Sequence, residues 1–399
     1  MTDSDPDLLS KLCLVVLRLA AQMTTKLARN ATVVLFVCFL VASACGGSAA
    51  PLSAGSPAAS TAGTAAAKTA APPTPTTPPT PAATPKPVVW PLTGSKAEDA
   101  SPIKRRPLNI RLPNDPNARP QYGLSKADLV FEMIVEGGVT RFSAIFHSKD
   151  VGTVGPIRSY RFSDLHLTQM LKGALASSGS TIEERDAVTQ SIKDGNMLSV
   201  DADRDGRPYY RVSFRPAPNN EFSGTPALRE AVNRAGGAAP VDVPPLAFLP
   251  SAEHEATAGG FVGSVAARTA TVPFQTWPAT FTWDEGSKGY RRSQQGAQTV
   301  DGDGSGPILA RNVIVMTTDI WLTAVIEDSL GSKGLDYRMT GGGPVSVFRD
   351  GLRIDGTWKR DGVLDMFTFF DPTGKEILLE PGQTWIHFIY TTWSVTSSP

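Results

Sequence analysis

The pattern of apolar and polar positions predicts two kinds of secondary structure in different parts of the chain. After about residue 310, short segments alternate between apolar and polar side chains and end in turns that contain glycine or aspartate. A period of two residues is typical of half-buried strands. We therefore predict strands at 313–316, 345–348, 352–358, 366–370 and 384–389. Asp350-Gly351 predicts a tight type I′ hairpin turn between two of them.

Helical signals appear only earlier in the chain. Residues 162–171 carry apolar side chains near helical spacing, and Thr181 with Glu184 forms a capping box ahead of an apolar stripe. Thr225-Pro226 predicts the start of a third helix. Strands are predicted at 128–136 and 141–147, on either side of a glycine-rich turn.

These elements predict an α+β protein. We expect a mixed N-terminal α/β-type domain at 105–250, followed by a β-rich C-terminal domain at 260–392, both carried on a disordered Pro/Ala/Thr stalk. Prolines between residues 240 and 250 mark the approach to the boundary between the two domains.

The hairpin at 128–147 holds the first candidate chemistry. A two-residue Gly137-Gly138 turn would place Arg141 opposite Ile134, on the same face as Glu132 and Glu136. A guanidinium between two carboxylates is a structural brace. The alternative is a pair of catalytic carboxyl groups, which requires that one of them is not neutralised. The sequence favours the brace over catalysis.

Basic residues after the hairpin are candidates for binding. Arg158, Ser159 and Arg161 precede a predicted helix and can either hold an anion at its N-terminus or tie the helix to Glu132 or Glu136. Arg211 and Arg215 are further candidates for a binding surface.

The N-terminal region predicts export and lipid attachment. Residues 31–44 form an apolar run behind Lys26 and Arg29, and small residues lead into Cys45. We interpret 1–45 as a signal peptide with a lipobox, with Cys45 as the lipidation site and Met23 as a possible true start. The alternative is an ordinary signal peptide that is cleaved near Ala44.

Composition supports a tethered protein outside the cytoplasm. Residues 46–104 are rich in Pro, Ala, Thr and Ser, and half of the residues from Pro72 to Pro87 are proline. Such a segment buries too little apolar surface to order itself, so we expect a stalk. The 38 basic and 38 acidic residues balance, which does not favour a nucleic-acid partner.

Metal and cofactor signals are weak. All three cysteines lie at or before Cys45, so the folded region has no thiol chemistry. Asp201, Asp203 and Asp205 match the first half of a calcium loop, but Val212 stands where the bidentate glutamate belongs. An exposed polar turn is the favoured interpretation there. We expect no metal site and no cofactor. Trp358 and Trp385 lie on predicted strands, where core packing is favoured over a sugar-stacking platform.

Several motifs resemble the YerB-like bacterial lipoproteins, a family of unknown function. They include Val135-Glu136-Gly137-Gly138, Thr140-Arg141-Phe142, Gly155-Pro156-Ile157-Arg158-Ser159, Tyr210-Arg211 and Gly356-Thr357-Trp358-Lys359-Arg360. The resemblance implies a two-part extracytoplasmic lipoprotein and carries no established reaction. Where we expect histidine in a Pro-His-Asn motif, this chain has Asn219.

Two functions remain open from the sequence. The first, which we favour, is a non-catalytic binding or scaffold protein, lipid-anchored to the bacterial cell membrane, whose partner is a cell-wall polymer, a ligand or an envelope protein. The second is an envelope hydrolase or transferase that acts on a cell-wall polymer through Glu132 or Glu136 beside Arg158 and Arg161.

Overall fold

The computed structural model of the chain describes residues 88–250 and 262–399, and the structural statements below concern those residues. The lipobox at Cys45, the alternative start at Met23 and most of the predicted stalk lie outside them. Within the described ranges, no helix has both the length and the apolar character needed to cross a membrane.

The described chain contains helices α2 (Phe162–Met170), α3 (Ile182–Lys193) and α4 (Thr225–Arg234). Its N-terminal segment forms β1 (Leu108–Pro113), β2 (Leu129–Ile134), β3 (Thr140–Phe146), β4 (Ala174–Ala176), β5 (Leu198–Ser199), β6 (Tyr210–Arg211) and β7 (Glu221–Phe222). Its C-terminal segment begins with β8 (Val265–Ala266), β9 (Thr269–Val272), β10 (Ala279–Asp284), β11 (Gly289–Gln294), β12 (Ala297–Gln298), β13 (Val300–Asp301), β14 (Gly306–Pro307) and β15 (Leu309–Ala310). It continues with β16 (Asn312–Thr318), β17 (Ile320–Ile326), β18 (Lys333–Tyr337), β19 (Gly341–Arg349), β20 (Leu352–Arg360), β21 (Thr368–Phe370), β22 (Thr384–Tyr390) and β23 (Thr396–Ser398).

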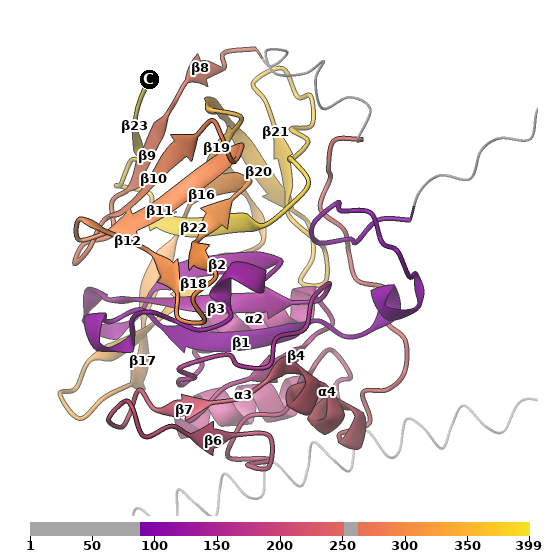
Figure 1. The fold of residues 1–399 in the computed structure, drawn as a ribbon. Coiled ribbons are helices and arrows are strands. Elements are labelled where there is room, and N and C mark those ends of the chain that lie inside the picture. Colours follow the sequence, from indigo (N-terminus) through magenta and orange to yellow (C-terminus); the bar gives the residue numbers. More distant parts are fainter. Residues whose placement is uncertain (1–87, 251–261) are drawn as a thin grey trace, which may run out of the picture. The chain divides into compact units, whose positions relative to one another are not determined.

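The two segments share one large sheet. Its strand order is β21-β20-β19-β16-β22-β2-β3-β1-β4-β5, with β8 beside β20. The segments meet where β2 runs parallel to β22, with Leu129 opposite Thr384. In Figure 1 the purple strands β1, β2 and β3 continue the sheet that begins with the orange and yellow strands. The N-terminal and C-terminal segments are therefore joined by backbone hydrogen bonds.

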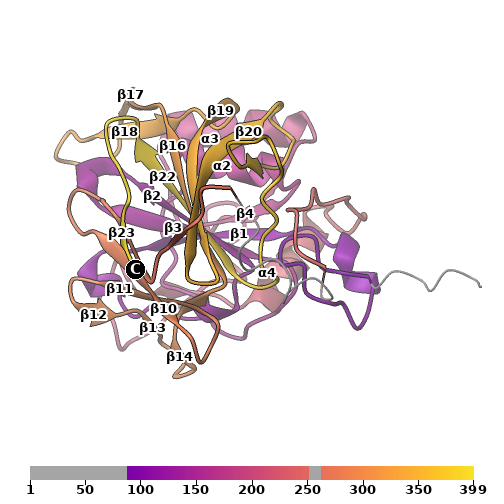
Figure 2. The ribbon, with the colours of Figure 1, turned by 90° about the horizontal axis from the view of Figure 1, so that it is seen from above.

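Different layers cover the two faces of the large sheet. On one face, Asn109 of β1 donates a hydrogen bond to Thr168 of α2 (2.9 Å). On the other face lies a second sheet, of order β12-β11-β10-β9-β23 with β15 beside β11. Phe281 of this second sheet packs against Trp385 of β22, with ring centroids 5.7 Å apart. Figure 2 shows α2 and α3 on the side of the large sheet opposite β10, β11 and β12.

The predicted fold class is confirmed, and several local signals formed as expected. Thr181 and Glu184 cap α3 reciprocally, as the capping box predicts. Asp350 and Gly351 both have positive φ angles (55° and 71°), as a type I′ turn requires. Trp358 and Trp385 are buried, so their indoles pack in the core and offer no platform to a sugar.

The folded chain begins earlier than the sequence analysis expects. Leu92 is fully buried, and the amide of Gly382 donates to the carbonyl of Thr93 (2.8 Å). The amide of Leu246 donates in the same way to Pro91 (3.0 Å). The composition of residues 88–104 did not predict that they are ordered. They are polar and contain proline, and only a few apolar side chains, such as Leu92, pack into the core.

Candidate functional site

The hairpin of β2 and β3 has a different register from the predicted one. Ile134 pairs with Thr140, and Met133 pairs with Arg141. The turn takes three residues, Glu136–Gly138, instead of two. Because neighbouring side chains on a strand point to opposite faces, this one-residue shift separates residues that were expected together. The prediction that Arg141 lies between Glu132 and Glu136 is therefore wrong.

Glu132 lies on the face that the second sheet covers, and it is fully buried. Arg292 of β11 donates to both of its carboxylate oxygens (2.8 and 3.1 Å). Asn114 (3.1 Å) and Thr140 (2.9 Å) donate to Oε1. The ring of His387 lies 3.5 Å from Oε2, and burial together with the charge of Arg292 lowers the pKa of this histidine well below its ordinary value. We call these five residues the Glu132 cluster.

Glu136 lies on the other side of the hairpin, beside α2. Its carboxylate accepts hydrogen bonds from Arg141 (2.5 Å) and from two nitrogens of Arg161 (2.5 and 2.9 Å). Burial alone would raise the pKa of Glu136, but the hydrogen bond from Arg161 and the charges of both arginines lower it to about 2. Arg161 also approaches Glu184 (3.8 Å) and Glu327 (3.1 Å). These five residues are the Glu136 cluster.

This geometry does not provide a pair of catalytic carboxyl groups. Glu132 and Glu136 are separated by the sheet, and each is held by at least one guanidinium group. Glu132 has no exposed surface on which a substrate could approach. Glu136 is ionised at neutral pH, so it has no proton to donate as a general acid.

Of the binding candidates after the hairpin, Arg161 contacts Glu136, whereas the side chains of Arg158 and Ser159 bond to neither glutamate within the described residues. Ser159 contributes its carbonyl oxygen, which accepts from Arg141 (2.8 Å). The first turn of α2 is already capped by Asp164, which accepts from the amide of Arg161 (2.8 Å). Arg158 donates to Asn219 (3.3 Å) instead of facing this helix end. No bound anion is needed to satisfy the start of α2.

Arg211 and Arg215 lie in a separate region. Arg215 donates to the carbonyls of Ala118 and Pro120 (both 2.6 Å), so it holds the loop that follows β1. Arg211 donates to Asn220 (2.8 Å) within the ribbon of β6 and β7.

The three aspartates of the possible calcium loop are paired with arginines. Asp201 contacts Arg204 (2.9 Å), Asp203 contacts Arg185 (2.8 Å), and Asp205 contacts Arg207 (2.7 Å) and Arg234 (2.9 Å). Among residues 88–250 and 262–399, no three His, Cys, Asp or Glu side chains are grouped so that they could hold a metal ion.

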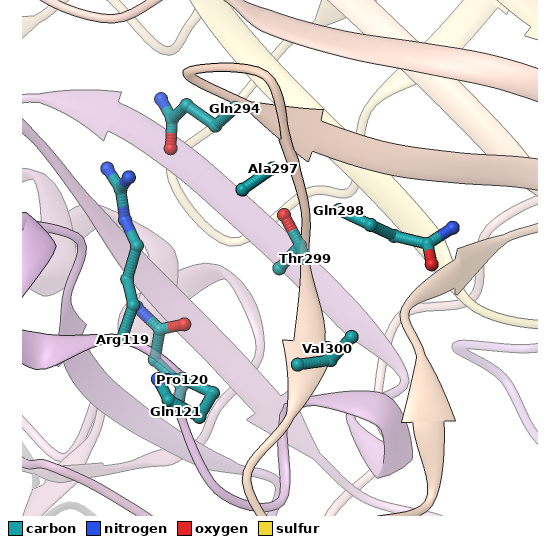
Figure 3. Close-up of a pocket in the computed structure, with 8 residues that line it drawn as sticks. All are labelled: Arg119, Pro120, Gln121, Gln294, Ala297, Gln298, Thr299 and Val300. Carbon is teal, nitrogen blue, oxygen red and sulfur yellow. The ribbon is translucent and has the colours of Figure 1, made fainter.

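A pocket that the sequence analysis did not predict lies between the two segments. Its volume is about 200 Å³. Figure 3 shows the loop after β1 on one side and the ends of β11, β12 and β13 on the other. The pocket is lined by Arg119, Pro120, Gln121, Gln294, Ala297, Gln298, Thr299 and Val300.

The Glu132 cluster is hydrogen-bonded to two side chains that line this pocket. Oε1 of Gln294 accepts from Asn114 (2.9 Å) and from Arg292 (3.0 Å), and the Thr299 hydroxyl accepts from Arg292 (2.8 Å). The same buried polar network that joins the segments therefore also fixes two of the side chains that line the pocket.

Arg119 supplies the positive charge of the pocket wall. Its guanidinium donates to the side chain and carbonyl of Asn114 (3.2 and 2.7 Å) and to Gln295 (2.7 Å). It also lies 5.2 Å from the ring centroid of Trp277. Among the described residues, no carboxylate oxygen lies within 4.0 Å of it. Burial and the charge of Arg292 lower the pKa of Arg119, so its charged form is destabilised in the absence of an anion.

Fold and site together define a class: an α+β protein whose two consecutive segments share a sheet and enclose a small pocket with an arginine in its wall. Residues 92–238 match the N-terminal domain, and residues 270–386 the C-terminal domain, of a family described as "Protein of unknown function (DUF3048)". The Bacillus subtilis (strain 168) protein named "Putative lipoprotein YerB" is 30% identical over 304 residues, which cover 75% of this chain and 85% of that relative.

A solved structure agrees with this likeness. The crystal structure of the YerB protein from Bacillus subtilis aligns with a TM-score of 0.66 at 26% identity, and the alignment covers 78% of this chain and 100% of that one. The chain belongs to the YerB-like family of two-part DUF3048 proteins, and the resemblance stated from the sequence is confirmed.

Proposed function

We propose that the chain is a non-catalytic binding protein, lipid-anchored through Cys45 on the outer side of the bacterial cell membrane. Its pocket would receive an anionic group of a cell-wall polymer, a small ligand or an envelope protein. The anchor is supported by the lipobox pattern and by the relative whose name calls it a lipoprotein.

The unpaired charge of Arg119 is the observation that carries the proposed ligand chemistry. Across the Glu132 cluster, the carboxylate of Glu132 offsets the charge of Arg292. Within residues 88–250 and 262–399, Arg119 donates only to the neutral acceptors of Asn114 and Gln295. An anion in the pocket would supply the missing partner, and hydrogen bonds between ionised groups are among the stronger ones.

The pocket suits the end of a ligand more than a whole molecule. Sites for drug-sized ligands typically enclose ~300–1,000 Å³, whereas this one has about 200 Å³. Gln298 is exposed at its margin, so a longer polymer or a protein could continue outward from the pocket. Arg119, Gln294 and Thr299 are already held by hydrogen bonds, so these side chains lose little further entropy when a ligand binds.

The hydrolase or transferase alternative receives no support from the arrangement of its residues. Its two glutamates face different layers, and Arg158 and Arg161 are engaged with Asn219 and Glu136.

The test is capture at the pocket in intact cells. A photo-reactive residue at position 298 should cross-link a polyanionic polymer or an envelope protein, whereas one at exposed Glu230 of α4 should not. Arg119→Gln should abolish the capture and Arg119→Lys should retain part of it, because lysine keeps the charge. Equal capture by the parent and Arg119→Gln forms would refute the anion site.

The anchor is tested separately. A Cys45→Ala form should lose fatty-acid labelling and leave the membrane fraction. If it is still labelled, the lipidation site lies elsewhere.

A further inference from the structure

A second groove, away from the pocket at Arg119, lies between α2 and the two-stranded ribbon of β17 and β18. Its volume is about 270 Å³. Its lining includes His166 and Gln169 from α2, Trp321 from β17 and Asp336 from β18.

The ribbon places an aromatic ring and a carboxylate next to each other. Trp321 and Asp336 are direct cross-strand partners, so their side chains project from the same face. The ring of His166 lies 3.0 Å from Asp336 and closes the side of the groove. Trp321 remains 46% exposed, and its indole stacks on no other ring among the described residues.

The ribbon is attached firmly to the body of the protein. The hydroxyl of Tyr337 donates to the carbonyl of Ile134 (2.6 Å), and the Tyr337 ring packs edge-on against Phe388 (5.9 Å). Tyr337 follows Asp336 directly, so the position of the carboxylate is fixed before any ligand binds. A preformed site loses little conformational entropy on binding.

Two polar atoms in this groove are unused hydrogen-bond acceptors. Oδ2 of Asp336 and Oε1 of Gln169 have no partner among residues 88–250 and 262–399, since Asp336 bonds through Oδ1 and Gln169 through Nε2. These atoms would accept from hydroxyl groups.

The neighbouring cations are already engaged. Arg338 donates to Asp319 (2.7 Å), and Arg360 donates to the carbonyls of Asp365 (2.8 Å), Met339 (3.0 Å) and Val363 (2.5 Å). The groove therefore does not present a free guanidinium to an anion, in contrast to the pocket at Arg119. It combines an open aromatic face with acceptors at its edge.

We propose that this groove binds one saccharide ring with free neighbouring hydroxyl groups. The apolar face of the ring would lie on the indole of Trp321, and two hydroxyl groups would donate to Asp336 and Gln169. The combination of one apolar surface with a few oriented polar groups is typical of small-molecule sites. This site is separate from the pocket in the proposed function and does not depend on it.

The test is titration of the full chain, in a sugar-free zwitterionic detergent, with maltotriose and with triacetylchitotriose. At least one probe should bind saturably, and the tryptophan emission should change with the same dissociation constant. Trp321→Ala should weaken binding about tenfold, as expected for the loss of one stacking contact. Trp321→Phe should restore part of the affinity, and Asp336→Asn should weaken it severalfold.

Two matched variants separate this site from the alternatives. Leu322 is the next residue on β17, is 64% exposed and belongs to the other face of the ribbon, so Leu322→Ala should leave the affinity unchanged. Arg119→Gln should also have no effect. The proposal is overturned if neither probe binds at millimolar concentration, if Leu322→Ala weakens binding as much as Trp321→Ala, or if Arg119→Gln abolishes it.

Discussion

Glu132 and Glu136 are four residues apart in the sequence, yet they belong to two clusters with different charge balance. In the Glu132 cluster, one carboxylate meets one guanidinium, and every residue of the cluster is at most 2% exposed. In the Glu136 cluster, the carboxylates of Glu136, Glu184 and Glu327 surround only the guanidinium groups of Arg141 and Arg161.

The difference indicates different roles. A balanced, enclosed pair joins two segments that are distant in sequence, because Arg292 comes from β11 and Glu132 from β2. A cluster with one carboxylate in excess has to retain a proton, and it therefore responds to pH. We infer that the Glu132 cluster stabilises the junction of the segments, whereas the Glu136 cluster makes the attachment of the β17–β18 ribbon pH-dependent.

The largest effect is expected from Arg292→Met. This change leaves the Glu132 carboxyl group without its guanidinium partner in a closed interior, and the loss of one partner of a buried ion pair typically costs ~3–5 kcal/mol. It also removes the guanidinium from the rings of Phe142 and Trp385, each 5.2 Å away. Denaturant unfolding should show the loss as a much lower midpoint.

A double variant serves as the control for that prediction. Glu132→Gln with Arg292→Met removes both charges, so it should recover a substantial part of the lost stability. If Arg292→Met unfolds at the same midpoint as the parent, the Glu132 cluster does not stabilise the junction.

A smaller effect is expected from Arg141→Met. Glu136 would keep its hydrogen bonds from Arg161, so only one of its two guanidinium partners is lost. The carbonyl of Ser159 also loses its donor. We expect a loss of ~1–3 kcal/mol, the usual range for a buried polar group that loses a partner. Arg141→Lys should lose less, because it keeps the charge, and thermal unfolding of the three forms compares them. A loss from Arg141→Met as large as that from Arg292→Met would contradict the ranking.

The fold class and the helices could be predicted from the sequence because their causes are local. The capping box of Thr181 and Glu184 and the turn at Asp350-Gly351 act over a few residues. The hairpin register could not be predicted, because a two-glycine turn can close with two or three residues and the pattern of side chains does not decide between them. Because the turn has three residues instead of two, Arg141 bonds to Glu136 and not to Glu132.

The candidate site was missed for a related reason. Arg292 reaches Glu132 across 160 positions of the sequence, and the pocket forms only after β11 and the loop after β1 come together. Arg119 looks like an ordinary loop arginine in the sequence. Its unusual property is that no carboxylate oxygen of the described residues lies within 4.0 Å of its guanidinium, and only the folded arrangement decides this.

The smallest effect is expected in the pH dependence that the Glu136 cluster gives to the free energy of unfolding. It should appear in two separate pH ranges, one acidic and one near neutral. Burial raises the pKa of Glu327 from 4.5 to about 8, and the charges of Glu184 and Glu136 act in the same direction against the opposing charge of Arg161. Glu136 behaves oppositely, because its two arginines outweigh its burial and lower its pKa to about 2.

The signs of these shifts give opposite pH trends. A raised pKa contributes stability below the unfolded value of about 4.5, and this contribution is lost as the pH rises through about 8. A lowered pKa contributes stability above about 4.5, and this contribution is lost as the pH falls towards 2. Glu327→Gln should therefore flatten the decline in unfolding free energy between pH 5 and 8. The expected change is on the order of 1 kcal/mol, because Glu184 shares the proton. Glu136→Gln should reduce only the loss of stability at acidic pH.

The free energy of unfolding, measured at intervals from pH 3 to 9, compares the parent, Glu327→Gln and Glu136→Gln. If the unfolding free energy of Glu327→Gln changes with pH as that of the parent does between pH 5 and 8, the Glu136 cluster does not hold an extra proton. The two clusters would then differ only in their number of charged groups.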